Sequence, residues 1–88
     1  MRTGNVTIRC AEGLHLRIAS QVAKIAKQAG GPVHITCDGC QHANACSVLE
    51  LLTLGAAAGT PLEIVVDGPH EERVLLELTE VFEAGGGI

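Results

Sequence analysis

The apolar residues of the chain follow two different spacings, and this change of spacing limits the folds that the chain can adopt. Apolar and polar residues alternate in three segments, at residues 5–10, 33–37 and 62–67. Apolar residues recur every three or four positions in two others, at residues 16–29 and 69–82. Alternation is typical of half-buried strands, and the longer spacing is typical of amphipathic helices. The pattern predicts a domain in which strands and helices are interspersed.

Turn and capping residues define the expected limits of the first and last helices. Gly30-Gly31-Pro32 follows the first helical segment and is expected to end it. Pro69 suits the first position of the last helix, with Glu71 and Glu72 in its opening turn, where carboxylates are favoured.

A short helix and a hairpin are expected in the middle of the chain. Ser47 and Glu50 have the spacing of a capping box, which predicts a helix from there to Leu54. Asp38-Gly39 predicts a two-residue hairpin turn after the segment at residues 33–37. The return strand, which ends near residue 43, has little β-propensity and is expected to be a short edge strand.

The order of elements is therefore β-α-β-β-α-β-α, and it predicts an α+β fold. Three helices with apolar faces and four half-buried strands bury each other best when the helices cover one face of an antiparallel sheet. A chain of 88 residues is expected to form one domain, spanning residues 1–88.

Composition excludes several classes of function. Six Lys and Arg against ten Asp and Glu leave a formal charge of −4, and the chain has no Trp or Tyr to stack on bases, so no nucleic acid is expected as a partner. No segment is apolar enough for a membrane span or an export signal. The sequence predicts a cytoplasmic protein without membrane association.

His15 and Arg17 are the strongest candidates for chemistry. They lie two residues apart where a strand pattern changes to a helical one, so His15 is expected beside the unpaired N–H groups and positive dipole end of a helix. A phosphoryl group on the ring would face those amides, and Arg17 could donate paired hydrogen bonds to it. The alternative for His15 is an ordinary exposed residue at a helix start.

Residues 13–20, Gly-Leu-His-Leu-Arg-Ile-Ala-Ser, resemble the active-site motif of the HPr family, usually Gly-Leu-His-x-Arg-Pro-Ala. HPr proteins are the histidine-containing phosphocarriers of the bacterial phosphotransferase system. The resemblance continues through Lys24, Lys27, Ser47, the run to Leu54-Gly55, and Gly59. It implies an open-faced β-sandwich with strand order 1-4-2-3.

The resemblance also implies a function. His15 would accept a phosphoryl group at Nδ1 from enzyme I and donate it to an enzyme IIA-type acceptor, with Arg17 stabilising the charge. The protein would be a carrier, not an enzyme in its own right, and it would need no cofactor. Sugar uptake and the nitrogen-regulatory branch of the family both remain open.

Further positions take expected roles from the same resemblance. Lys24 and Lys27 would form the basic rim of a surface that docks partner proteins, and apolar residues of the second helix would form the centre of that surface. These apolar residues are Val48, Leu49 and Leu52. Ser47 matches the serine that an HPr kinase phosphorylates in some bacteria, although its role as a helix cap already explains it.

Three positions depart from the family pattern. Ile18 replaces the usual proline, so the first helix loses a fixed backbone angle and gains an N–H. Cys46 and Glu50 stand where many members have lysine or another residue that is not acidic. The change in charge is expected to weaken docking to an acidic partner or to select a different one.

Two other classes of function compete with the carrier. Cys37, Cys40, His42 and Cys46 lie within ten residues, and a two-residue hairpin would bring the first three together as weak candidate ligands for zinc. The third possibility is a regulatory homologue that binds partners on the same fold without accepting phosphate. Retention of both His15 and Arg17 argues against that role.

Overall fold

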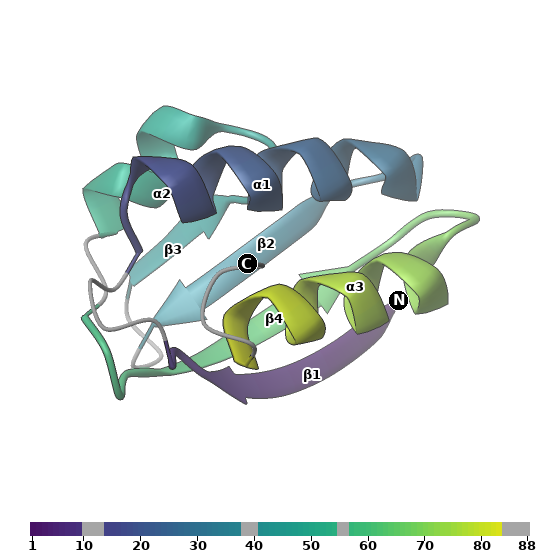
Figure 1. Ribbon diagram of the computed structural model, residues 1–88. Helices are drawn as coiled ribbons and strands as arrows, with labels where there is room; N and C mark the ends of the chain where they lie inside the picture. The colour runs from purple at the N-terminus through teal and green to yellow at the C-terminus, as the bar shows by residue number, and fades with distance from the viewer. Residues whose placement is uncertain (10–13, 38–40, 55–56, 84–88) are drawn as a thin grey trace.

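The computed structural model describes residues 1–9, 14–37, 41–54 and 57–83. Its elements form two layers, a sheet and three helices that cover one face of the sheet (Figure 1). In chain order the elements are β1 (Arg2–Thr7), α1 (Leu16–Ala26), the 3₁₀ turn η1 (Lys27–Ala29), β2 (Val33–Cys37), β3 (Gln41–Asn44), α2 (Val48–Leu54), β4 (Pro61–Val66) and α3 (Glu71–Glu83). The predicted β-α-β-β-α-β-α order and the α+β class are confirmed.

The sheet is antiparallel throughout, with strand order β1-β4-β2-β3. The strand order implied by the resemblance is therefore confirmed. Ile35 on β2 pairs with Ile64 on β4 and with Ala43 on β3. Because side chains alternate along each strand, this register directs the apolar positions of neighbouring strands to the same face.

The core lies between that face and the helices. The buried side chains of the sheet are Val6, Val33, Ile35, Cys37, Ala43, Leu62, Ile64 and Val66. Those of the helices and of η1 are Ile18, Ala19, Val22, Ala23, Ala26, Ala29, Leu51, Leu54, Val74, Leu78, Val81 and Phe82. His34 and Glu63 point the other way and are exposed, so the second face of the sheet meets solvent.

Glycine holds the end of the first helical segment in place. Gly30 follows η1 with φ +80°, the left-handed conformation that glycine adopts without strain. Gly68 has φ +126°, and a Cβ there would collide with the backbone oxygen of Ala29. This close approach packs the end of η1 against the turn before α3, and it requires glycine on the turn.

Three details of the sequence prediction were wrong. β1 begins at Arg2 and ends at Thr7, whereas residues 5–10 were expected; residue 10 lies outside the described ranges. Leu16, the first residue of α1, is 61% exposed, and the apolar face begins at Ile18 and Ala19. α3 begins two residues after Pro69, because Gly68 to Glu71 form a turn closed by the Glu71 N–H on the Gly68 oxygen, 3.2 Å apart.

The third error concerns the hairpin between β2 and β3. Cys37 pairs with Gln41, so three residues separate the strands where two were expected. The turn residues 38–40 themselves lie outside the described part of the chain. Among the described helices, none combines the length and the apolar character that a membrane crossing requires.

Candidate functional site

His15 caps the N-terminus of α1. Its backbone is extended, with φ −101° and ψ 179°, and its carbonyl oxygen accepts the first helical hydrogen bond from the Ala19 N–H at 2.8 Å. The backbone N–H of Arg17 donates to Nδ1 of the His15 ring at 3.3 Å. The imidazole thus takes the place of the serine, threonine or aspartate oxygen that usually caps a helix. In this bond Nδ1 is the acceptor.

The surroundings of His15 favour an anion. The first turn of α1 contains no acidic residue, and the helix dipole places partial positive charge at this end. The Arg17 side chain is exposed and makes no hydrogen bond or ion pair with any other described residue. His15 itself is half-buried. The structure therefore brings together the two residues that the motif singled out, through the hydrogen bond from the Arg17 N–H to the His15 ring.

Lys24 and Lys27 follow Arg17 along the exposed side of α1 and η1. Both lysines are exposed, and within the described ranges neither forms an ion pair. α1 also packs against α2, so the basic residues and the second helix lie on neighbouring elements (Figure 1).

Ser47 begins α2 as the sequence predicted, but the capping box is only half formed. The Glu50 N–H donates to Oγ of Ser47 at 3.3 Å. The Glu50 carboxylate does not return to the Ser47 N–H; it accepts from the Asn44 N–H at 3.0 Å. The Ser47 N–H instead donates to the Asn44 carbonyl oxygen at 2.9 Å. Glu50 therefore links α2 to the end of β3, a contact that only the fold could reveal.

The apolar residues of α2 divide between the core and the surface. Leu51 and Leu54 are buried, whereas Val48 and Leu52 are half-buried. Leu49 is 77% exposed. This helix therefore has more apolar residues than it buries, and the docking role of Val48, Leu49 and Leu52 stays a prediction.

The proposed cluster of zinc ligands is not assembled by the described residues. The predicted pairing of Cys37 with Cys40 was wrong, because Cys37 pairs with Gln41. Cys37 faces the core, whereas His42, which pairs with Thr36, is exposed. Cys46 is half-buried in the loop before α2, and Cys40 lies outside the described ranges. No group of three His, Cys, Asp or Glu side chains within those ranges could hold a metal ion.

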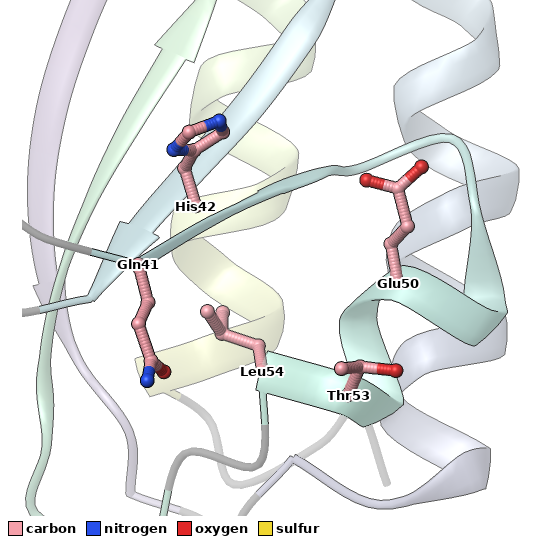
Figure 2. Close-up of a pocket in the computed structure, with 5 residues that line it drawn as sticks. All are labelled: Gln41, His42, Glu50, Thr53 and Leu54. Atoms are coloured by element: carbon pink, nitrogen blue, oxygen red, sulfur yellow. The ribbon is translucent and has the colours of Figure 1, made fainter.

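A shallow pocket of about 450 Å³ lies between β3 and α2. Gln41 and His42 line it from the strand, and Glu50, Thr53 and Leu54 line it from the helix (Figure 2). Sequence reasoning identified His42 and Glu50 for other reasons and missed the pocket. No sequence signal could have found it, because it depends on how α2 packs beside the edge strand.

Fold and site together define an open-faced β-sandwich of the α+β class whose first helix is capped by a histidine. The chain belongs to the HPr family of phosphocarrier proteins of the phosphotransferase system. The family model described as the PTS HPr component phosphorylation site matches residues 3–84.

Known proteins of this family resemble the chain over most of its length. It is 35% identical to the phosphocarrier protein HPr of Chlamydia trachomatis, over 92% of this chain and 73% of that protein. It is 36% identical to the HPr of Haemophilus influenzae, over 89% of this chain and 91% of that protein. The crystal structure of HPr-C-His from Thermoanaerobacter tengcongensis superposes with a TM-score of 0.91 at 24% identity, over 100% of this chain and 98% of that one. The last comparison shows the shared fold.

Proposed function

We propose that this protein is a phosphocarrier in which His15 accepts a phosphoryl group from enzyme I and donates it to an enzyme IIA-type acceptor. The observation that carries the proposal is the hydrogen bond from the Arg17 N–H to Nδ1 of His15. The bond holds Nδ1 beside a backbone donor, and its release makes the lone pair of Nδ1 available for attack on phosphorus. Membership of the HPr family supports the same role.

The transfer step uses groups that the chain itself provides. Nδ1 attacks phosphorus of the phosphorylated donor, a new N–P bond forms, and the donor's bond to phosphorus breaks with its electron pair remaining on the donor. As the lone pair of Nδ1 forms the N–P bond, the Arg17 N–H leaves Nδ1 and donates to a phosphoryl oxygen. The Arg17 guanidinium binds the remaining charge through paired hydrogen bonds, which the single charged head of a lysine cannot copy. Because the site is open, a second protein can remove the group.

Docking would use the surface beside His15. Lys24 and Lys27 are exposed on α1 and η1 and would attract an acidic partner, while Leu49 provides an apolar contact on α2. Val48 and Leu52 would support this contact from their half-buried positions.

The proposal also includes how the protein is regulated, which branch of the phosphotransferase system it serves and where in the cell it lies. Ser47 is a candidate for phosphorylation by an HPr kinase, but its Oγ already accepts from Glu50 and an added phosphate would lie near the Glu50 carboxylate. The cytoplasmic location expected from the sequence belongs to the same proposal. The branch, sugar uptake or nitrogen regulation, is set by the acceptor that takes the phosphoryl group.

Phosphorylation with phosphoenolpyruvate and purified enzyme I tests the assignment. One acid-labile, base-stable phosphoryl group per chain is expected on the wild type. His15→Asn should take none, although asparagine retains an oxygen that can cap α1. His70→Asn changes another exposed histidine and should be phosphorylated normally. An unmodified wild type that still binds enzyme I would indicate the regulatory alternative instead.

A further inference from the structure

The backbone N–H of Ile18 lies in the first turn of α1, one residue beyond the N–H that binds His15. Helical hydrogen bonding begins at Ala19, whose N–H donates to the His15 carbonyl oxygen. The Ile18 N–H precedes this point and has no acceptor within the part of the chain that the structure describes. Its side chain is only 3% exposed, and this packing holds the residue in the core. The turn therefore holds in place a donor that a ligand can use.

The capping geometry directs this donor toward the His15 side chain. His15 is the N-cap, so Arg17 and Ile18 are the second and third helical residues. A side chain at the N-cap accepts from the N–H of the second or third residue, so both N–H groups lie within reach of an N-cap side chain. Nδ1 uses the N–H of Arg17. A phosphoryl group added to Nδ1 extends the side chain over both donors.

We propose that the Ile18 N–H is a positioning donor that binds one oxygen of the phosphoryl group on His15, while the Arg17 N–H binds another. This inference rests on the proposed function. The bond exists only in the phosphorylated form, since the unmodified ring has no oxygen to accept it, and hydrogen bonds to charged oxygens are stronger than neutral ones. It therefore shifts the equilibrium toward the phosphorylated carrier. A proline at position 18 has no N–H and cannot make it.

Competition between two forms of the protein for phosphoryl groups tests this role. Equimolar wild type and Ile18→Pro are mixed with a limiting amount of phosphoenolpyruvate and a catalytic amount of enzyme I, which equilibrates phosphoryl groups between the two. Intact-mass spectrometry then gives the phosphorylated fraction of each, because the chains differ in mass. We expect a preference of about fivefold for the wild type, the effect of losing one partly solvated hydrogen bond.

Ile18→Ala is the matched control, because it loses buried side-chain atoms but retains the N–H. It should share phosphoryl groups equally with the wild type. Equal sharing by Ile18→Pro, or the same preference against Ile18→Ala, overturns the inference. If Ile18→Pro does not fold, the Ile18 amide proton of the wild type decides: a downfield shift on phosphorylation supports the bond, and an unchanged shift overturns it. A wild type that accepts no phosphoryl group overturns the proposed function as well.

Discussion

Nδ1 of His15 accepts a hydrogen bond from the backbone N–H of Arg17, two residues further along the chain. The backbone of Arg17 therefore binds His15, whereas its guanidinium makes no hydrogen bond or ion pair with any other described residue. Substitution of the Arg17 side chain leaves the backbone donor in place, so the backbone donor can be tested apart from the charge.

Replacing Arg17 with lysine should slow phosphoryl transfer by about tenfold, and replacing it with alanine should slow transfer further. Lysine retains the charge but loses the two-pronged geometry, and alanine loses both. Rapid-quench measurements of transfer from phosphorylated enzyme I give the rates. Arg73→Lys on α3 is the control and should behave as the wild type. Equal rates for Arg17→Lys and the wild type would remove the guanidinium from the mechanism.

The double substitution of Lys24 and Lys27 by glutamate should raise the KM for enzyme I by roughly tenfold with little change in kcat. The reason is that the two lysines would act on encounter and docking with an acidic surface, not on the bond that forms. The wild-type reaction should weaken as salt increases, and the variant should lose most of this dependence. Arg73→Glu, which changes an exposed basic residue on α3, should leave the KM unchanged.

Leu49 and Leu51 are neighbours on α2 but should respond oppositely to alanine. Leu49 is 77% exposed, so Leu49→Ala should change the free energy of unfolding by no more than about 0.5 kcal/mol while raising the KM for enzyme I. Leu51 is fully buried, so Leu51→Ala should cost about 2–5 kcal/mol of stability. Urea unfolding followed by circular dichroism measures both values. A Leu49→Ala variant with normal kinetics would exclude this residue from the docking surface.

Ser47→Ala should lower the free energy of unfolding by about 1 kcal/mol, because the Glu50 N–H loses its capping oxygen. For a domain of this size the melting temperature should fall by roughly 4–8 °C. Differential scanning calorimetry measures the change. Ser20→Ala, at an exposed position inside α1, should cause no such loss. Unchanged melting of Ser47→Ala would mean that the cap contributes little.

Protein purified without chelator should contain no stoichiometric zinc. Cys37 faces the core and His42 is exposed on the strand beside it, so the two cannot meet at the bond lengths of about 2.0–2.3 Å that zinc requires. Elemental analysis by mass spectrometry provides the test, with a chelator-treated sample as reference. Stoichiometric zinc that disappears in His42→Ala would contradict the expectation.

Most of the fold could be predicted because the residues responsible are close in sequence. The alternation around Val33 and Ile35 depends only on side chains two positions apart, and the end of the first helical segment depends on Gly30. The strand order came from resemblance to a family, since pairing between β1 and β4 joins residues far apart in the chain, such as Thr3 and Val65, which are 62 positions apart. Residue patterns alone contain no record of such pairings.

The turn between β2 and β3 is one residue longer than predicted, and this difference removes the predicted pairing of candidate zinc ligands. Asp38-Gly39 favoured a two-residue turn, and that turn would have set Cys37 opposite Cys40. The observed partner is Gln41, because the pairing of the whole sheet, in which Ile35 lies between Ile64 and Ala43, sets the register of β3. The free energy gained from a preferred local turn is small compared with the free energy gained by burying a complete sheet face.

From the amino-acid order alone it follows that His15 begins a helix, that Arg17 lies beside it, and that apolar faces repeat along each element. These properties are local, since they depend on backbone preferences and on side chains a few positions apart. Three-dimensional packing alone establishes that the Glu50 carboxylate binds the Asn44 N–H, that Leu49 is exposed, and that the Ile18 N–H is held by a buried side chain. These properties arise where distant segments compete to bury the same surface, and the outcome depends on the whole chain at once.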